Sequence, residues 1–356
     1  MNSSITVRGA TSTFSLMETR LSTLAPSPAR RAGASCASLG PAYFITACLV
    51  IAAILGVFAS PARAQSEVIM LTGNTGGVYY PLGIALARIW ERAIPGTRVS
   101  VQATQASVEN FNLLQQRRGT FALGQGDVMS DAFKGNAEAG FPSSRDRLRM
   151  VAALFPNYLH LVALKSAKVR SVLDLKGKRV SVGASRSGNE LNARVLLGAA
   201  GMSYADLRRV DYLPYNDAVA LMRDGQLDAV IVSAGLGVKA VSELAFAVPV
   251  DVVPIAGELI AKSNGIFSPV TIPAGTYAGQ TSDVPTAALV NFLVTHSDVP
   301  DDLVYAAVKA LYDHLPELKA SHIAARDIAR ERALVSRPIA LHPGAARYFR
   351  ETGMLR

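Results

Sequence analysis

The sequence predicts an α/β protein of two lobes with a ligand cleft between them. A pattern of strand, loop and helix begins near residue 67, and the same pattern begins again near residue 179. Two extended apolar segments, Leu148–Phe155 and Leu159–Lys165, lie between the two occurrences. Strands that alternate with helices are typical of parallel sheets covered by helices. Because this architecture recurs without a repeat of the sequence, we expect two lobes around a cleft.

The first occurrence contains three strands and two helices. We expect a strand at 67–72, a helix from 79 to about 94, a strand at 98–103, a helix at 107–118 and a strand at 120–124. Glycine-rich Gly73–Gly77 ends the first strand, and Pro95-Gly96 ends the first helix, whose apolar residues share one face. Ser107 is placed to cap the second helix.

The second occurrence has the same order of elements. We expect a strand at 179–183, a helix at 188–200, a strand at 209–213, a helix from 217 and a strand at 227–233. Ser187 and Glu190 have the spacing of a capping box, and Gly201 is suited to end that helix. The rest of the chain predicts an extended stretch at 287–295 and helices near 301–314, 321–335 and 344–351. Its return to the first lobe would give lobe I at 66–158 plus 268–356, and lobe II at 159–267.

The N-terminal region has the pattern of a secretory signal. A basic arm precedes the uncharged apolar run Ala42–Ala59, and Ala62-Arg63-Ala64 follows it. The order basic, apolar, small-x-small predicts a signal peptide over 1–64 that is cleaved after Ala64. An uncleaved membrane anchor is the alternative, because the run is just long enough to span a bilayer. Translation could start at Met1 or at Met17.

Charge and cysteine content exclude some classes of protein. The formal net charge is +9, but the basic residues form no dense block of the kind that binds nucleic acid. A moderate positive charge is compatible with an anionic ligand. The only cysteines, Cys36 and Cys48, lie in the segment expected to be removed. We therefore expect an exported protein without disulfides or thiol chemistry.

Motifs for catalysis, metal and cofactor binding are absent from the sequence. There is no H-E-x-x-H zinc motif, no P-loop and no dinucleotide fingerprint. The segment Gly183–Gly188 fails the G-x-S-x-G spacing of a nucleophile elbow. The sequence therefore predicts no catalytic residue, no metal site and no cofactor.

Two loops favour ligand binding instead. Asn74–Gly77 and Ser185–Asn189 are rich in Gly, Ser and Thr, and each follows an expected strand and begins an expected helix. The first N–H groups of a helix lack partners within it and lie at its positive end, which suits an anion. Each loop alone could be an ordinary capped turn. Two such loops in two lobes favour a ligand in the cleft.

Other candidates lie at further junctions between strand and helix. Ser107 and Asn110 follow one strand, and Gln125 ends another, where open α/β sheets bind ligands. Ser107 could serve only as a cap. Tyr79 or its neighbour Tyr80 could face the cleft from the first helix.

Several motifs give the chain a specific resemblance. They are TGGVYYPLG (Thr75–Gly83), SVEN (Ser107–Asn110), DLKGKRVSVG (Asp174–Gly183), SG (Ser187-Gly188), DGQLDA (Asp224–Ala229), IPAGTYAGQ (Ile272–Gln280) and LHPGA (Leu341–Ala345). With these motifs in order, the sequence resembles the TAXI family of solute receptors, the extracytoplasmic binding subunits of TRAP-type transporters. The resemblance implies a type II periplasmic-binding-protein-like fold of two hinged lobes.

The resemblance also implies a function. A monomeric periplasmic receptor would close on a small organic anion, such as a glutamate-like amino acid or an oxo or dicarboxylic acid. It would then deliver this solute to a TRAP-type permease in the membrane. A sensor that presents its ligand to a membrane histidine kinase would have the same cleft and is the alternative. The identity of the ligand stays open.

The chain departs from the family pattern where the cleft is expected. Gln105-Ala106 stands where Thr-Gly-Gly is common, Ser185-Arg186 replaces smaller residues, and Gly235-Leu236-Gly237 replaces a Gly-x-Pro. Arg186 would clamp a second carboxylate of the ligand, or it would point to solvent or pair with a surface acid such as Glu190. The expected ligand-binding residues are Thr75, Gly76, Gly77, Tyr79, Ser107, Asn110, Gln125, Ser185, Arg186, Ser187, Gly188, Asn189 and Gly235.

Overall fold

One hydrogen-bonded sheet runs through the protein in the computed structural model, which describes residues 66–356. Its strands are β1 (Ser66–Leu71), β2 (Thr97–Gln102), β3 (Phe121–Gln125), β4 (Leu148–Leu164), β5 (Arg179–Ser181), β6 (Arg209–Asp211), β7 (Ala229–Ala234), β8 (Val250–Val253), β9 (Ser268–Ile272) and β10 (Val284–His296). The expected signal peptide and its cleavage site lie outside the described residues.

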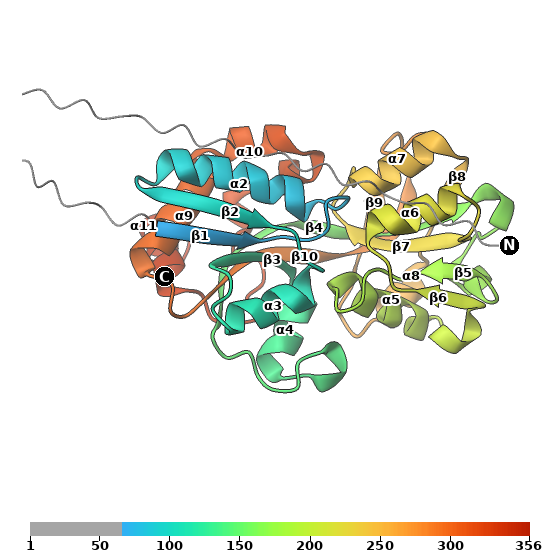
Figure 1. Ribbon diagram of the computed structural model, residues 1–356, viewed down its shortest axis with the longest axis horizontal. Coiled ribbons are helices and arrows are strands. Elements are labelled where there is room, and N and C mark those ends of the chain that lie inside the picture. The colour runs from blue at the N-terminus through green and yellow to red at the C-terminus, as the bar shows by residue number, and fades with distance from the viewer. Residues whose placement is uncertain (1–65) are drawn as a thin grey trace, which may run out of the picture. The chain divides into compact units, whose positions relative to one another are not determined.

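Helices cover the sheet (Figure 1). They are α2 (Tyr79–Ala93), α3 (Ser107–Gln115), α4 (Gly126–Lys134), α5 (Gly188–Ala199), α6 (Tyr215–Arg223), α7 (Lys239–Ala247), α8 (Gly257–Ala261), α9 (Asp301–Asp313), α10 (Leu315–Ser321) and α11 (Pro343–Glu351). In the described part of the chain, none of these helices combines the length and the apolar character needed to span a membrane.

The strand order is β2-β1-β3-β10-β4-β7-β5-β6, with β8 beside β4 and β9 beside β10. At one end β1 is parallel to β2 and β3, and at the other β5 is parallel to β6 and β7. The long strands β4 and β10 lie antiparallel between these parallel groups and belong to both halves of the molecule (Figure 1). The mixed α/β class is therefore confirmed.

The strand β4 changes partner along its length. Tyr158 pairs with Ala288 of β10 and with Ala234 of β7, and the residues after it continue along β7 and β8. The sequence predicted two separate extended segments here, but the backbone stays extended through Pro156 and Asn157. The division into lobes at 66–158 plus 268–356 and 159–267 stays a prediction.

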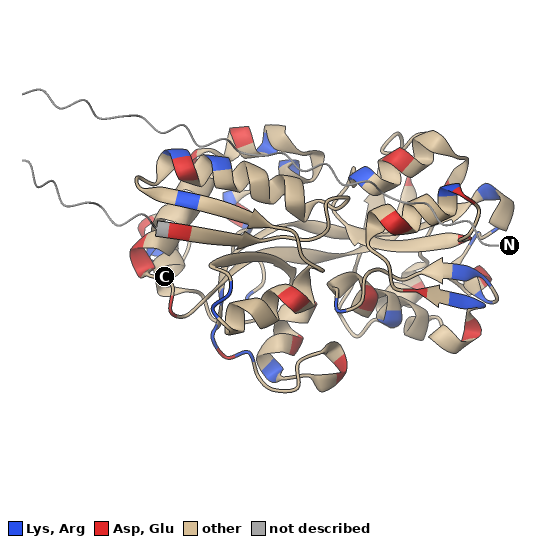
Figure 2. Cartoon of the chain, in the orientation of Figure 1, with Lys and Arg blue, Asp and Glu red and all other residues tan. Residues whose placement is uncertain are grey.

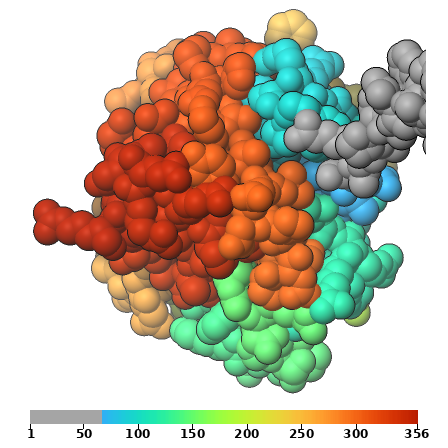
Figure 3. All heavy atoms as spheres, turned by 90° about the vertical axis from the view of Figure 1, so that its left-hand side faces the viewer, coloured from blue at the N-terminus to red at the C-terminus, as the bar shows by residue number. Residues whose placement is uncertain are grey.

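The C-terminal helices pack on the N-terminal part of the chain. Trp90 of α2 is buried against Phe121, with ring centroids 4.8 Å apart, and its Nε1 donates to the carbonyl oxygen of Ala307 in α9 at 3.0 Å. Figure 3 shows this end of the molecule, where the red and orange C-terminal residues lie beside the cyan N-terminal ones. Burial of these aromatic rings contributes strongly to the core of this half.

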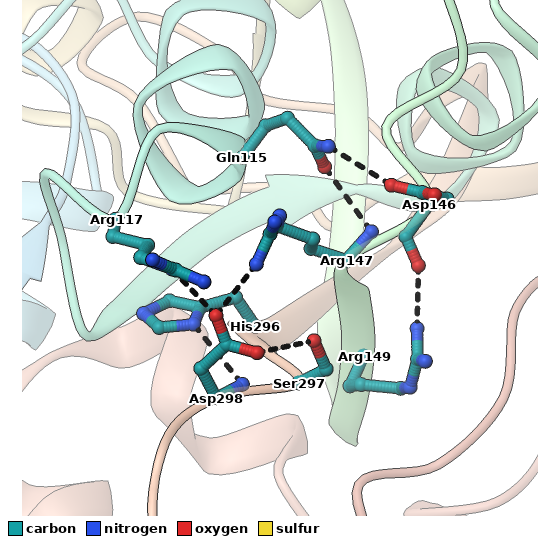
Figure 4. A network of polar contacts seen from close by, with 8 residues as sticks. All are labelled: Gln115, Arg117, Asp146, Arg147, Arg149, His296, Ser297 and Asp298. Carbon is teal, nitrogen blue, oxygen red and sulfur yellow. Dashed lines mark hydrogen bonds and ion pairs between the residues drawn. The ribbon is translucent and has the colours of Figure 1, made fainter.

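A cluster of ion pairs lies in the same half of the molecule, next to the first residues of β3 and β4. Asp298, just after β10, accepts from Arg117 Nε at 2.5 Å and from Arg147 at 2.6 Å (Figure 4). Hydrogen bonds from Ser297 and Arg117 lower the pKa of the Asp298 carboxyl. Because Thr295 pairs with Phe121 at the first residue of β3, this cluster lies at the opposite end of β3 from Gln125.

Three predicted elements differ from the structure. The helix expected at 321–335 consists of short 3₁₀ turns, Ile323–Asp327 and Arg330–Arg332. Ser107 is the first residue of α3 and not its cap, because Ala106 holds the N-cap position. Ser187 does cap α5 through the Glu190 N–H, but the Glu190 carboxylate pairs with Arg194 instead of completing a capping box.

Candidate functional site

Five helices begin around one cavity. Tyr79, Ser107, Gly188 and Tyr215, the first residues of α2, α3, α5 and α6, line it, and so does Gln125, which precedes α4. Parallel strands followed by helices explain this convergence, because the carboxyl ends of such strands and the amino ends of their helices meet at one edge.

The cavity is narrow. It holds about 470 Å³ of empty space, part of it open solvent, and the centre of a water molecule can reach only about 30 Å³ of it. Its lining comes from residues 73–125 on one side and 184–234 on the other, with Asn157 of β4 between them. A ligand here would contact both halves of the chain.

Among residues 66–356, no charged side chain lines the cavity. The lining residues are Gly73, Asn74, Gly77, Val78, Tyr79, Gln105, Ala106, Ser107, Gln125, Asn157, Ala184, Ser187, Gly188, Asn189, Tyr215, Ser233 and Ala234. Charged residues lie mostly toward the two ends of the molecule in Figure 2, and the middle is mostly tan. Backbone N–H groups and neutral side chains are therefore the groups that this cavity offers to a ligand.

Seven of the residues expected from the sequence line the cavity. They are Gly77, Tyr79, Ser107, Gln125, Ser187, Gly188 and Asn189. The other six, Thr75, Gly76, Asn110, Ser185, Arg186 and Gly235, do not line it. The sequence thus placed both glycine-containing loops at the cavity but misjudged which of their residues face it.

Asn110 has a structural role beneath the cavity. It is fully buried, and its amide Nδ2 donates to the carbonyl oxygens of Thr72 at 2.7 Å and Leu123 at 2.8 Å. Its Oδ1 accepts from the Thr104 hydroxyl at 2.7 Å. Because these bonds hold the ends of β1 and β3 together, Asn110 positions the loops and has no free group for a ligand.

Thr75 and Gly76 contact the opposite half of the chain. The Thr75 hydroxyl accepts from Asn216 Nδ2 at 3.2 Å, and the Gly76 carbonyl accepts from the Ala240 N–H at 3.2 Å. A Cβ on Gly76 would lie 2.1 Å from Asn216 Oδ1. A side chain at position 76 would therefore displace the Asn216 side chain, and the pair helps hold the loop against α6 and α7.

Arg186 and its neighbour Ser185 are exposed and do not line the cavity. Arg186 has φ 59° and lines a surface hollow with Glu109 and with Gln105, which also lines the cavity. Of the alternatives for Arg186, the structure agrees with exposure to solvent, and Glu190 pairs with another residue, accepting from Arg194 Nε at 2.6 Å.

Gly235 is required by packing. A Cβ there would lie 2.5 Å from the Cβ of Ala324 and 3.0 Å from the Phe155 ring.

A chain of polar side chains, of which the sequence indicated only Gln125, connects residues of the cavity lining to Asp127. The Ser233 hydroxyl accepts from Gln125 Nε2 at 3.1 Å and from Asn157 Nδ2 at 2.8 Å, and donates to Asn192 Oδ1 at 2.7 Å. Asn192 Nδ2 donates to Asp127 Oδ2 at 2.7 Å. The available signal was Asn157, an amide in a mostly apolar extended segment, where a polar group needs a partner if it is buried.

Burial sets the protonation of groups near the cavity. It raises the pKa of Asp127 to about 6, against the hydrogen bond from Asn192, so this carboxyl is ionised at neutral pH. Burial also raises the pKa of the Tyr79 and Tyr215 hydroxyls, which stay protonated. Tyr215 donates to the Ser233 carbonyl oxygen at 2.8 Å, and Tyr79 donates to Asn291 Oδ1.

Some buried oxygens at the cavity have no partner. Asn74 Oδ1, Gln125 Oε1 and Asn157 Oδ1 make no hydrogen bond within the protein. Buried polar atoms are almost always paired, so each unpaired oxygen indicates where a ligand or water would bind. Among the described residues, no group of three or more His, Cys, Asp or Glu side chains is arranged to hold a metal ion.

Comparisons with known proteins agree with this architecture. Residues 70–353 match the NMT1-like family. MatC from Rhodopseudomonas palustris with bound malate superposes with a TM-score of 0.54 at 13% identity, over 82% of this chain and 97% of that one. A periplasmic transporter superposes with a TM-score of 0.50 at 13% identity, over 75% and 88% of the two chains. The chain belongs to the NMT1-like family and has the fold of periplasmic solute-binding proteins.

Proposed function

We propose that the protein is an extracytoplasmic receptor that captures a small organic anion in this cavity and releases it unchanged. The observation that carries the proposal is the convergence of five helix N-termini on an uncharged cavity. Unpaired N–H groups and the positive ends of these helices stabilise an anion without any Lys or Arg. A glutamate-like amino acid or an oxo or dicarboxylic acid has a suitable carboxylate.

Delivery to a TRAP-type permease is the second part of the proposal. It is supported by the TAXI-like motifs, of which TGGVYYPLG contributes Gly77–Tyr79, SVEN contributes Ser107 and SG contributes Ser187 and Gly188 to the cavity lining. The signal-like region before Ala64 supports export to the periplasm, where a monomeric receptor would meet the permease. A sensor for a membrane histidine kinase is the alternative, and a permease or a kinase gene next to this one would favour transport or sensing respectively.

Binding without turnover can be tested on the mature protein. Isothermal titration with L-glutamate, 2-oxoglutarate, L-malate, L-alanine and pyruvate should reveal a ligand that binds one-to-one. The same ligand should raise the melting temperature, because it stabilises the folded state alone. The ligand should be recovered intact after incubation with the protein. Its consumption would contradict the proposal.

A glycine pair on α5 provides a matched test of the site. A Cβ at Gly188 would lie 2.1 Å from Gln125 Oε1 and 3.0 Å from Ser107 Oγ, whereas a Cβ at Gly198 would meet nothing within 4 Å. Gly188→Ala should therefore abolish binding, and Gly198→Ala should leave it unchanged. Wild-type affinity in Gly188→Ala would show that the ligand binds elsewhere.

A further inference from the structure

We propose that Asp127, through Asn192 and Ser233, fixes the hydrogen-bond polarity of the cavity so that it favours an acid that also carries a hydrogen-bond donor, such as an amino or amide N–H, over the matching oxo acid. The inference rests on the proposed function and specifies its ligand. It concerns which atoms of Gln125 and Asn157 face the ligand, and why they cannot turn.

Two amide oxygens of residues that line the cavity have no hydrogen-bond partner among the described residues. Gln125 and Asn157 both line it, and their side chains are 3% and 1% exposed. Each donates its NH₂ group to the Ser233 hydroxyl, while Gln125 Oε1 and Asn157 Oδ1 make no hydrogen bond. Leaving a buried acceptor unpaired is unfavourable, so these two oxygens favour a ligand that donates to them.

The chain of bonds that begins at Asp127 determines this orientation. An ionised carboxylate only accepts hydrogen bonds, so Asn192 must direct its NH₂ group to Asp127 and its oxygen to Ser233. Ser233 has a single hydroxyl proton, which it donates to Asn192 Oδ1. The Ser233 oxygen can therefore only accept hydrogen bonds from its other two neighbours, Gln125 and Asn157.

The opposite orientation of the side-chain amide is therefore excluded for both Gln125 and Asn157. Turning Gln125 or Asn157 would place its oxygen against the Ser233 oxygen with no proton between them. The NH₂ groups consequently stay on Ser233, and the two oxygens stay toward the ligand. Asp127 does not line the cavity, so it acts as a positioning residue through Asn192.

This polarity discriminates between acids. The helix N-termini hold the carboxylate, and the two amide oxygens accept from an ammonium or amide N–H of the same ligand. A keto oxygen at that position would face two acceptors and leave all three without a proton. An acid with an amino or amide group should therefore bind more tightly than the matching oxo acid.

Matched pairs of acids test the inference. Titrations with L-glutamate against 2-oxoglutarate, and L-alanine against pyruvate, compare an amino with an oxo group on the same carbon skeleton. We expect the amino member of the pair that binds to be favoured by at least about ten-fold, which corresponds to ~1.4 kcal/mol. Equal binding, or tighter binding of the oxo acid, would overturn the inference and leave the proposed receptor intact. Binding of neither pair nor of L-malate would contradict the proposed function itself, and the inference with it.

A substitution outside the cavity tests the role of Asp127. Asp127→Asn can donate to Asn192 and so releases the fixed order of donors, which should reduce the amino-to-oxo preference several-fold. Asp131→Asn removes a carboxylate one turn later on α4 that bonds Asn136 instead, and it should keep the wild-type ratio. An unchanged ratio in a folded Asp127→Asn variant would overturn the positioning role. If that variant does not fold, the ratio of the affinities of the wild-type protein for the amino acid and the oxo acid still tests the polarity of the cavity.

Discussion

At the scale of single residues, His160 is a buried group whose protonation affects the stability of the fold. It is completely buried on β4, and its Nε2 lies 2.9 Å from the Tyr277 hydroxyl, while Nδ1 lies 3.1 Å from the Tyr158 carbonyl oxygen. Burial lowers the pKa of His160 to about 4. The neutral ring therefore joins the 273–282 loop to the central strand.

We predict that acid destabilises the protein through His160. The unfolded chain binds this proton near pH 6.5 and the folded chain only near pH 4, so the free energy of unfolding falls as the pH drops from 6.5 to 4. The loss should reach about 3 kcal/mol below pH 4. Urea denaturation across this range, with His160→Gln as reference, isolates the effect. Parallel pH profiles for the two proteins would contradict it.

Arg186 is predicted to be dispensable for binding. Its exposed side chain lies outside the cavity, although the sequence suggested a clamp for a second carboxylate. Arg186→Ala should bind the ligand found by titration with unchanged affinity at low and high salt. A clear loss of affinity for a dicarboxylate alone would show that this loop turns inward when ligand binds.

At the scale of secondary-structure elements, the start of α3 stores backbone strain. Ala106, its N-cap, has φ 69° and ψ −143°, a region that only glycine adopts readily. The resemblance to the TAXI family pointed to this position, where glycine is common. The residue also lines the cavity, so the strain lies at the candidate binding site.

We predict that Ala106→Gly stabilises the protein by about 1 kcal/mol or more, because it removes this strain. Ala103→Gly, in the same connection but without a positive φ, should destabilise it through the added freedom of the unfolded chain. Chemical denaturation of both variants measures the contrast. A destabilised Ala106→Gly variant would mean that the strain contributes less to the free energy of unfolding than the conformational entropy that glycine adds to the unfolded chain.

The spacing of apolar residues correctly predicted those helices that pack a single face against the core. Leu82, Leu86 and Ile89 of α2 are buried at helical spacing, as the sequence indicated. The same reasoning failed at 321–335, since Ala324, Ala325 and Ile328 are also buried at near-helical spacing but belong to short turns. Spacing reports which side chains are buried, and it does not report how many consecutive turns the backbone makes.

The sequence indicated where much of the candidate site lies, but it did not indicate which of its residues contact one another. Glycine and serine at 187–188 follow a strand and begin a helix, so local chemistry indicated them. Asn157 and Ser233 meet only because β4 and β7 are neighbours, and no local pattern announces that contact. Asn110 was misjudged for the same reason, since its partners Thr72 and Leu123 come from two other strands or their ends.

At the scale of the whole molecule, we expect the two halves to separate when a ligand enters the cavity. The centre of a water molecule reaches only about 30 Å³ of the cavity, which is too little for an organic acid. The Thr75–Asn216 and Gln125–Ser233 bonds join the two sides. The strands β4 and β10 continue through both halves, and their pairing is irregular between Val290 and Phe292, where a sheet bends most easily.

We predict that weakening one cross-cavity bond speeds release of the ligand. Asn216 is exposed, and its Nδ2 donates to the Thr75 hydroxyl without lining the cavity. Asn216→Ala should raise the dissociation rate constant by roughly two- to ten-fold, the range for loss of one hydrogen bond. Asp217→Asn, the next residue of α6 and also exposed, should leave that rate unchanged. Stopped-flow fluorescence measures both variants. Equal rates would mean that the closed form is held by the ligand and the buried contacts alone, because the exposed bond would then exchange freely with water at no cost to closure.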